Sequence, residues 1–378
     1  MQARQKILNG HESVKVAIVQ TPPAFLDKDA TIDIACAKIA EAAKNGANII
    51  AFSETWVAGY PYWGEGWESH LPDWVDVRTR FYDNAMMIPS DDTRRLCNAA
   101  KKANAVVIIG CNELDSDPAV HTIYNTLLFI DNHGQILGKH RKVMPTFVER
   151  AFWGNGDASG MRSYPTDFGR IGGLICGEHL MTLARAHMIA QGEDIHLGVF
   201  PGAFSLHTGP SLEEPDSTGD YFWGYASSRA HSFEAGAFVM TSCGIMNDES
   251  LPDGFPMKDS LNIGYAKGGS AVYAPIAIPL VGPTYGDTIV YADCPAQMIK
   301  VAKAIIDTRG HYARNDLFEL KVNTPSPTPS VHEQNIRAVE SISSGELRRI
   351  ADRYELSRSE IVEAIEAQAR QLEAIEQS

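Results

Sequence analysis

This sequence lacks long apolar runs and closely spaced cysteines and has little positive charge, and each of these features argues against a class of protein. No run approaches the roughly 20 apolar residues that a membrane-spanning helix requires, and the first residues are too polar for a signal peptide. Positive charge is scarce, since 33 Lys and Arg residues against 47 Asp and Glu give a net charge of −14. Nucleic acids and anionic membranes are bound by clustered cations. We therefore expect neither of these partners.

Closely spaced cysteines are also missing. The chain has six cysteines and no CxxC pair. Scattered cysteines without an export signal are typical of free thiols in a reducing compartment, which predicts a cytoplasmic protein. Most of them should be small buried hydrophobic residues, although one could be a nucleophile. The six are Cys36, Cys97, Cys111, Cys176, Cys243 and Cys294.

The apolar pattern predicts an α/β protein. Hydrophobic residues make up 44% of the chain and charged residues 21%, the mix of a globular protein with a sizeable core. Short apolar runs predict strands over residues 14–20, 48–53, 105–111, 124–130, 135–140, 170–175, 195–200, 237–242, 272–280 and 288–292. Helical spacing predicts helices over residues 31–43, 92–104, 180–191 and 221–234. This alternation, with a hairpin-like pair of strands in the middle, indicates mixed sheets covered by helices.

The core-forming pattern stops before the chain does. It weakens after Asp307, and residues 324–330 (TPSPTPS) form a Pro/Ser linker that cannot be helical. Beyond the linker, residues 357–360 (SRSE) match a capping box at the start of an amphipathic helix. A single isolated helix is marginal in water. We expect one domain over residues 1–323 and, over residues 324–378, a linker and tail that pack against a neighbouring subunit.

Glu54, Lys142 and Cys176 each follow a short apolar strand, and sites in α/β sheets gather where strands end. A carboxylate can take the proton of a thiol, and an ammonium can stabilise charge that develops on the substrate, so the three groups suit acyl-transfer chemistry. Each also has an ordinary explanation. Cys176 could be a buried spectator, Lys142 a solvated surface charge and Glu54 the acceptor of a structural hydrogen bond.

The segments around these residues carry a resemblance. They are 52–55 (FSET) with 59–63 (GYPYW), 138–146 (GKHRKVMPT) with 149–150 (ER) and 153–157 (WGNGD), and 172–179 (GGLICGEH). In this order they resemble the glutamate, lysine and cysteine motifs of the nitrilase superfamily of carbon–nitrogen hydrolases, from about Val14 to about Asn323. Three motifs in order are highly specific, and GYPYW, RKxMPTxxER and WGxGD resemble the true nitrilase branch.

The resemblance implies a fold and an assembly. It implies an α/β protein with a four-layer αββα sandwich, which pairs into an αββααββα dimer and can extend into spirals or filaments. It implies no metal and no organic cofactor. The GxSxG, P-loop, HExxH and dinucleotide-binding patterns are absent from the sequence.

The resemblance also implies a nitrilase, a hydrolase that converts an organic nitrile to a carboxylic acid and ammonia. Cys176 would attack the nitrile as the nucleophile, with Glu54 as base and Lys142 as the group that stabilises charge, through a thioimidate and then a thioester. Glu149 maps to a second acid that orients Lys142 or the substrate, and an ion pair with Arg150 is the equally weighted alternative. Many nitrilases carry Trp directly after the cysteine, where this chain has Gly177, so we expect a wider pocket there.

Four further residues are candidates for substrate binding. Tyr60, Trp63 and Trp153 could line an apolar pocket, and aromatic residues at such positions also serve as ordinary core. His179 lies three residues after the nucleophile. A Cys–His dyad is the weaker interpretation of this spacing, since Glu54 is already available as base.

Two alternatives to a nitrilase remain open at this stage. The first is a cyanide hydratase or dihydratase, or an amidase, of the same superfamily, because the motifs do not determine which group leaves the tetrahedral intermediate. The second is a catalytically silent scaffold that kept the fold. The intact Glu54, Lys142 and Cys176 argue against the scaffold.

Overall fold

The computed structural model describes residues 6–68, 70–204 and 222–324. The chain divides into two units, Met1–Pro325 and Ser326–Ser378, and every described residue belongs to the first. The amphipathic tail expected after the Pro/Ser linker therefore lies outside the described residues. None of the described helices is long and apolar enough to cross a membrane.

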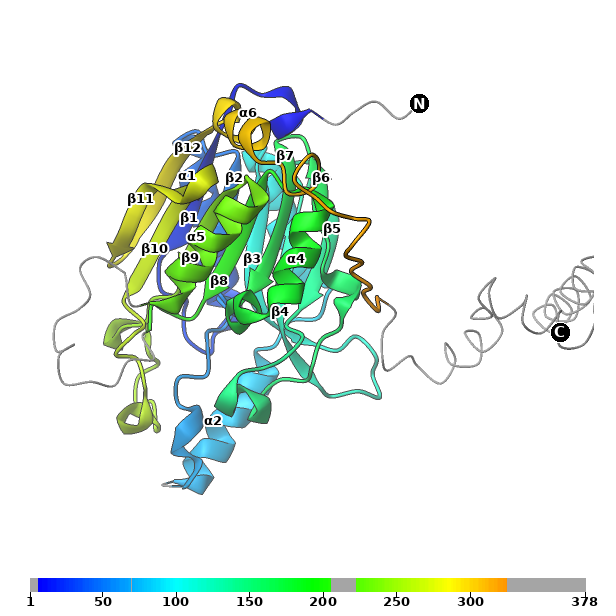
Figure 1. Cartoon of the computed structure of the whole chain (residues 1–378). Coiled ribbons are helices and arrows are strands. Elements are labelled where there is room, and N and C mark those ends of the chain that lie inside the picture. The colour runs from blue at the N-terminus through cyan, green and yellow to red at the C-terminus, as the bar shows by residue number, and fades with distance from the viewer. Residues whose placement is uncertain (1–5, 69, 205–221, 325–378) are drawn as a thin grey trace, which may run out of the picture. The chain divides into compact units, whose positions relative to one another are not determined.

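Two mixed sheets of six strands each form the centre of the described unit (Figure 1). The first sheet has the order β12 (Thr288–Pro295), β1 (Ser13–Gln20), β2 (Ile49–Phe52), β3 (Val106–Leu114), β4 (Ile123–Ile130) and β5 (Ile136–Arg141). The second has the order β11 (Ile278–Tyr285), β10 (Gly268–Ala274), β9 (Phe238–Cys243), β8 (Ile195–Phe200), β7 (Gly169–Ile175) and β6 (Tyr164–Thr166). In each sheet three neighbouring strands are parallel, β1–β2–β3 and β7–β8–β9, and the remaining pairs are antiparallel.

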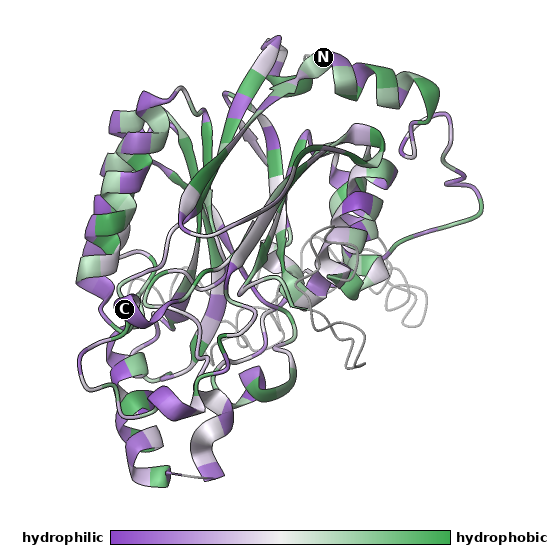
Figure 2. Ribbon diagram, turned by 90° about the vertical axis from the view of Figure 1, so that its left-hand side faces the viewer, coloured by the Kyte–Doolittle hydropathy of each residue, from purple (hydrophilic) through white to green (hydrophobic). Residues whose placement is uncertain are grey.

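Helices cover the outer faces of both sheets (Figure 2). The helices α1 (Lys28–Lys44) and α3 (Asp91–Ala103) pack on the first sheet, and α4 (Thr182–Gln191) and α5 (Trp223–Ala235) lie over the second. The result is the four-layer αββα sandwich that the family resemblance implies. Two further helices are α2 (Leu71–Asp83) and α6 (Ala296–Ile305).

Side-chain alternation along the strands separates the two cores. On β1, Val14, Val16 and Ile18 point into the layer between the sheets, whereas Ala17 and Val19 point toward the helices. All five are at most 1% exposed. Complete burial of one Val or Ile side chain contributes about 1.5–3 kcal/mol, so a strand that is buried on both faces reads as a continuous apolar run.

The strand predicted over residues 272–280 is wrong, because two strands occupy this region. β10 ends at Ala274, and β11 begins at Ile278 and runs antiparallel to it. Ile276 and Ala277 between them have φ angles of +66° and +64°, a left-handed conformation that reverses the chain. This conformation in a non-glycine pair gives no clear signal in the sequence.

The prediction also missed β6, α2 and α6. In α2, Val77 and Phe81 are the only fully buried residues of the helix. Such a narrow buried stripe leaves little apolar periodicity to detect.

Candidate active site

The ends of three strands meet at one place. β5 runs in the same direction as β2 and β3, because β4 is antiparallel to both of its neighbours, so β2 and β5 end at the same edge of the first sheet. Glu54 follows β2 and Lys142 follows β5, while Cys176 follows β7 of the second sheet. All three side chains are at most 2% exposed. The Lys142 ammonium hydrogen bonds to Glu54, and both groups shift the pKa of the Cys176 thiol, so the structure brings the three residues together.

Lys142 joins two buried carboxylates. Its Nζ donates to Glu54 Oε1 over 2.8 Å and to Glu149 Oε2 over 2.7 Å. Burial alone would favour the neutral amine, but the negative charges of Glu54 and Glu149, and that of Cys176 once it is a thiolate, hold the pKa of Lys142 well above its usual value. The residue is therefore a permanent cation. An ammonium has three donors, so one remains for a bound molecule.

Glu54 has one occupied and one open carboxylate oxygen. Oε1 accepts from Lys142 and from Asn125 Nδ2, which lies 2.7 Å away on β4. Oε2 is buried and has no hydrogen-bond partner among the described residues. Burial raises the pKa of Glu54 to about 7, and this effect outweighs the opposing effect of Lys142. A buried open oxygen on a carboxylate that titrates near neutral pH suits a proton acceptor.

Glu149 lies on the short 3-10 segment η3 (Phe147–Ala151) and is 2% exposed. Besides Lys142, its carboxylate accepts from the backbone N–H of Thr146 over 2.7 Å and from the Tyr60 hydroxyl over 2.8 Å. Of the two alternatives for Glu149, its partner here is Lys142. The Arg150 Nε donates to the carbonyl of Pro145 instead.

Cys176 lies at the junction between β7 and the 3-10 segment η5 (Cys176–Leu180), with a φ of +48°. Burial and the nearby Glu54 raise the pKa of its thiol well above the usual value. The Lys142 charge and the backbone N–H of Gly177 act in the opposite direction and favour the thiolate. The thiol is thus protonated at rest, and its use as a nucleophile requires a base that takes the proton as the attack begins.

Left-handed backbone occurs in all three motif loops. Thr55, Phe147 and Cys176 have φ angles of +42°, +47° and +48°. Each such non-glycine residue costs of order 1–3 kcal/mol and persists only where the surrounding structure enforces it. This local strain is consistent with a site whose geometry is fixed before any ligand binds.

Two glycines allow the loops to approach the sheet. A Cβ at Gly110 on β3 would lie 2.2 Å from the carbonyl oxygen of Ser53, next to Glu54. A Cβ at Gly156 would lie 2.1 Å from the carbonyl oxygen of Arg141, next to Lys142. Only glycine fits at these two positions, which gives a physical reason for the last glycine of the WGNGD segment.

Glu178 is a buried acid at the site that the sequence interpretation missed. Its Oε1 accepts from the backbone N–H of Val143 and its Oε2 from that of Ile175, both over 2.7 Å. It also faces His140 Nε2 at 2.8 Å, and although burial raises the pKa of Glu178, this histidine and the two amides bring the net value below the usual one. Glu178 therefore ties the backbone beside Lys142 to the backbone beside Cys176. A signal was present in the sequence, since an acid three residues after the end of a buried strand needs a partner if it is buried.

A pocket of about 220 Å³ opens onto Cys176 and Glu149. Most of its lining is aromatic or aliphatic, and Tyr60 belongs to it. The lining residues are Tyr60, Pro61, Tyr62, Gly64, Glu65, Thr146, Phe147, Val148, Glu149, Cys176, Pro201, Phe204, Asn262 and Tyr265. A pocket with an apolar wall and a few convergent polar groups is the usual form of a small-molecule site.

The other three candidates for substrate binding do not line this pocket in the described part of the chain. Trp63 is fully buried and packs edge-on against Phe152. Trp153 supports Tyr60 from behind, with ring centroids 5.5 Å apart. His179 Nδ1 lies 3.0 Å from the backbone carbonyl oxygen of Cys176. The structure thus places these side chains behind the pocket wall.

Gly177 is likewise not part of the pocket lining. A Cβ at this position would meet one atom within 4 Å, the Thr146 hydroxyl at 3.0 Å. Because Thr146 does line the pocket, a larger residue at 177 would act on the pocket through Thr146.

Comparison with known proteins places the chain in a family. The family pattern for carbon–nitrogen hydrolases matches residues 15–304. The chain is 35% identical over 312 residues to Nitrilase 2 of an unknown prokaryotic organism, which covers 82% of this chain and 92% of that protein. It is 34% identical over 326 residues to an aliphatic nitrilase of Rhodococcus rhodochrous, with 84% and 81% covered.

The fold agrees with solved structures of the same superfamily. Nit3 of Saccharomyces cerevisiae, a member of branch 10 of the nitrilase superfamily, superposes with a TM-score of 0.62 at 22% identity and covers 81% of this chain and 98% of its own. The family pattern covers most of the chain, and the identity to its relatives supports the same assignment. The chain belongs to the carbon–nitrogen hydrolase family, in the nitrilase branch.

Proposed function

We propose that this protein is a nitrilase that hydrolyses an organic nitrile to a carboxylic acid and ammonia. The observation that carries the proposal is the grouping of a buried thiol, Cys176, with the open carboxylate oxygen of Glu54 and the ammonium of Lys142 beside one apolar pocket. The apolar wall suits the uncharged body of a nitrile.

The first half of the reaction forms a covalent intermediate. Glu54 takes the thiol proton as the sulfur of Cys176 adds to the nitrile carbon, and the negative charge that develops on the nitrile nitrogen is stabilised by the free donor of Lys142. The proton held by Glu54 then passes to this nitrogen. The product is a neutral thioimidate and a Glu54 carboxylate ready for a second proton transfer.

The second half consumes two molecules of water. Glu54 takes a proton from the first water as its oxygen adds to the thioimidate carbon, and gives this proton to the nitrogen. Glu54 then carries the proton of the new hydroxyl to the same nitrogen, so that ammonia leaves and a thioester forms. Glu54 takes a proton from the second water as its oxygen adds to the thioester carbon. This proton passes to the sulfur of Cys176 as the carboxylic acid is released, which restores the thiol and the Glu54 carboxylate. Glu149 holds Lys142 in place throughout through its 2.7 Å hydrogen bond.

Product identification on a panel of aliphatic, aromatic and arylacetonitriles tests this function. We expect acid and ammonia in a one-to-one ratio from at least one nitrile. Stoichiometric amide without ammonia would instead indicate a hydratase, and turnover of amides alone an amidase. No turnover of any nitrile or amide by folded protein would support the silent scaffold.

The value of kcat/KM should decrease on the acid side of its pH profile as Glu54 becomes protonated. Burial raises the pKa of this carboxyl to about 7, and only the ionised form accepts a proton. As the pH falls below 7 the ionised fraction declines, so kcat/KM should decrease about tenfold for each pH unit below the inflection. The measurement is kcat/KM between pH 5 and 9 with a nitrile that does not ionise. A constant value down to pH 5 would remove Glu54 as the base.

We also propose that the protein self-associates through the outer face of the second sheet's helices. Leu180, Leu183 and Phe233 are 59%, 70% and 54% exposed, and α4 and α5 are neighbours joined by an ion pair between Arg185 and Glu234. Exposed apolar groups that cluster on adjacent helices mark interfaces.

The paired substitution Leu183→Glu with Phe233→Glu should dissociate the assembly. Multi-angle light scattering should give at least twice the chain mass of 41.4 kDa for the unmodified protein and the single-chain mass for the variant. Val75→Glu, at a residue that is 50% exposed on α2, is the matched control and should leave the mass unchanged. A monomeric unmodified protein would refute the proposal.

Two further expectations belong to this proposal. All six cysteines are free thiols, which supports a reducing compartment such as the cytoplasm. The steps above involve only side chains of this chain and water, so the proposed reaction requires no metal and no organic cofactor.

A further inference from the structure

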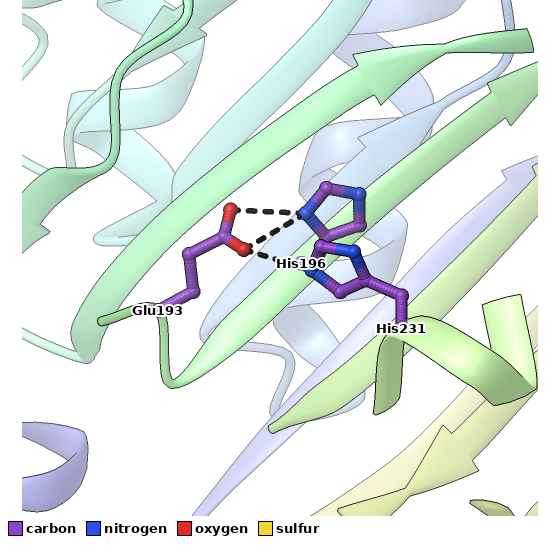
Figure 3. Close-up of side chains that lie close together, drawn as sticks. All are labelled: Glu193, His196 and His231. Atoms are coloured by element: carbon purple, nitrogen blue, oxygen red, sulfur yellow. Dashed lines mark hydrogen bonds and ion pairs between the residues drawn. The ribbon is translucent and has the colours of Figure 1, made fainter. Parts of the chain in front are cut away.

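A second buried polar cluster lies behind the nucleophile, and the reaction described above does not use it. Glu193 lies two residues before the first residue of β8, His196 lies on β8 and His231 lies on α5. All three are at most 1% exposed. Figure 3 shows the Glu193 carboxylate facing both rings, with Oε1 2.9 Å from His196 Nδ1 and Oε2 3.0 Å from His231 Nε2.

This cluster is connected to the active site by hydrogen bonds. His196 Nε2 lies 3.1 Å from His179 Nε2. The other ring nitrogen of His179, Nδ1, lies 3.0 Å from the carbonyl oxygen of Cys176. An unbroken chain therefore runs from Glu193 through His196 and His179 to the backbone of the nucleophile.

The chain of hydrogen bonds ends at the peptide group that joins Cys176 to Gly177. Its carbonyl oxygen lies 3.0 Å from His179 Nδ1, and its N–H, on Gly177, lowers the pKa of the Cys176 thiol and so favours the thiolate. In a planar trans peptide the C=O and the N–H point in opposite directions, so a group that holds the oxygen also aims the N–H. A donor on the carbonyl further polarises the peptide and strengthens its N–H as a donor.

The donors and acceptors along the chain require one extra proton. A carbonyl only accepts, so His179 Nδ1 carries hydrogen and the neutral ring must accept at Nε2. His196 then donates from Nε2 to His179 and from Nδ1 to the Glu193 carboxylate, which makes His196 an imidazolium paired with an ionised Glu193.

The electrostatics agree with this distribution of protons. Although burial opposes it, the two histidines lower the pKa of Glu193 to about 2. Burial and the neighbouring His196 lower the pKa of His231 to about 4 and that of His179 well below the usual value. Arg185 adds further positive charge that disfavours a second imidazolium.

Two glycines make room for the side chains of this chain of hydrogen bonds. A Cβ at Gly172 on β7 would lie 1.9 Å from Glu193 Oε1, and a Cβ at Gly198 on β8 would lie 3.0 Å from His179 Nε2. Both strands therefore lack a side chain where the cluster crosses them. A site of this kind is built into the sheet and is not a chance contact between surface groups.

We propose that Glu193, His196 and His179 form a positioning relay that holds the Cys176–Gly177 peptide by its carbonyl oxygen, in the orientation in which its N–H stabilises the Cys176 thiolate. The inference rests on the proposed role of Cys176 as nucleophile. His231 donates to Glu193 from the far side and lies outside the path to Cys176. The residues of the relay touch no substrate and act through the backbone of Cys176.

The variant Glu193→Gln tests the relay with little change in shape. A neutral amide no longer holds the extra proton on His196. If the amide oxygen faces His196, the tautomers reverse and His179 presents a lone pair to the Cys176 carbonyl. If the amide nitrogen faces His196, the chain stays connected but loses its charge. Either outcome weakens the Gly177 N–H as a donor to the thiolate.

The measurement is the rate of Cys176 alkylation by iodoacetamide against pH, followed by peptide mass spectrometry. We expect Glu193→Gln to move the inflection upward by about one pH unit and to slow alkylation about tenfold below it. His231→Gln, a matched control at an equally buried partner of Glu193, should change the rate less than about threefold at a similar loss of thermal stability.

A double-mutant cycle separates positioning from a general loss of structure. His179→Asn keeps a donor at the place of Nδ1 but removes Nε2, the link to His196, so Glu193→Gln should have no further effect in that background. Three outcomes would each overturn the relay. Glu193→Gln could have equal effects in both backgrounds, or no effect in either. The protein could also bind a stoichiometric metal ion in place of the proton. Absence of nitrile turnover leaves this test intact, whereas a Cys176 inert to alkylation at every pH would overturn the nucleophile and the relay together.

Discussion

Replacement of Cys176 by alanine should abolish turnover while the protein remains folded. The side chain is the proposed covalent nucleophile, and loss of such a group lowers kcat by roughly 10⁴-fold or more. The fold should tolerate the change, because the residue lines a pocket and alanine meets the same φ of +48° without added bulk. We expect a loss of stability of about 1 kcal/mol, measured by chemical denaturation alongside nitrile turnover.

The matched control for this prediction is Cys111→Ala. Cys111 is also a fully buried cysteine, but it lies on β3 in the core between the first sheet and its helices. Its replacement should cost a similar amount of stability and leave kcat within about twofold. Normal activity of Cys176→Ala, or equal losses in the two variants, would end the covalent mechanism.

Much of the fold could be predicted from the sequence because the strands are short and buried on both faces. Ile195–Phe200 is predicted residue for residue, and the strand expected over residues 170–175 is β7 shortened by one residue. Prediction failed where tertiary structure overrides local preference. The turn at Ile276 and Ala277 adopts left-handed angles that neither residue prefers, so two strands read as one.

The active site, too, could be predicted from the sequence only in part. Glu54, Lys142 and Cys176 could be found because each follows a strand within a recognisable motif. The sequence could not show that Trp63 and Trp153 lie behind the pocket, because an aromatic residue carries the same local signal in a core and in a pocket wall. The roles of Glu178 and Glu193 depend on partners from distant segments, Val143 and His231 among them, which no local pattern specifies.

Replacement of Lys142 by methionine should abolish turnover and also destabilise the protein. Methionine fills a similar volume but leaves Glu54 and Glu149 buried beside each other without the cation that now bonds to both. Removal of one partner from a buried ion pair costs about 3–5 kcal/mol, because the remaining charges are uncompensated. Loss of charge stabilisation in the transition state should lower kcat by at least about 10³-fold.

The pH dependence of this destabilisation distinguishes the buried carboxylates from a general packing defect. Without Lys142, the folded-state pKa of Glu54 rises further, because the cation that opposes the effect of burial is gone. An acid with a raised folded pKa destabilises the protein above its unfolded pKa. This penalty fades as the pH falls through the folded pKa, so the stability difference between the unmodified protein and Lys142→Met should be smaller at pH 5 than at pH 8. A packing defect would give the same difference at both values.

Lys139→Met is the matched control for Lys142→Met. Lys139 lies on β5, three residues before Lys142, and also bonds to a buried carboxylate, that of Glu113, but Arg141 remains as a second cation on this acid. The control should retain turnover, with a stability loss below about 1 kcal/mol, since its ammonium is partly exposed. If both variants lost activity equally, the effect of Lys142→Met would come from a disturbance of the segment around β5, and its assignment to the charge of the active site would be wrong.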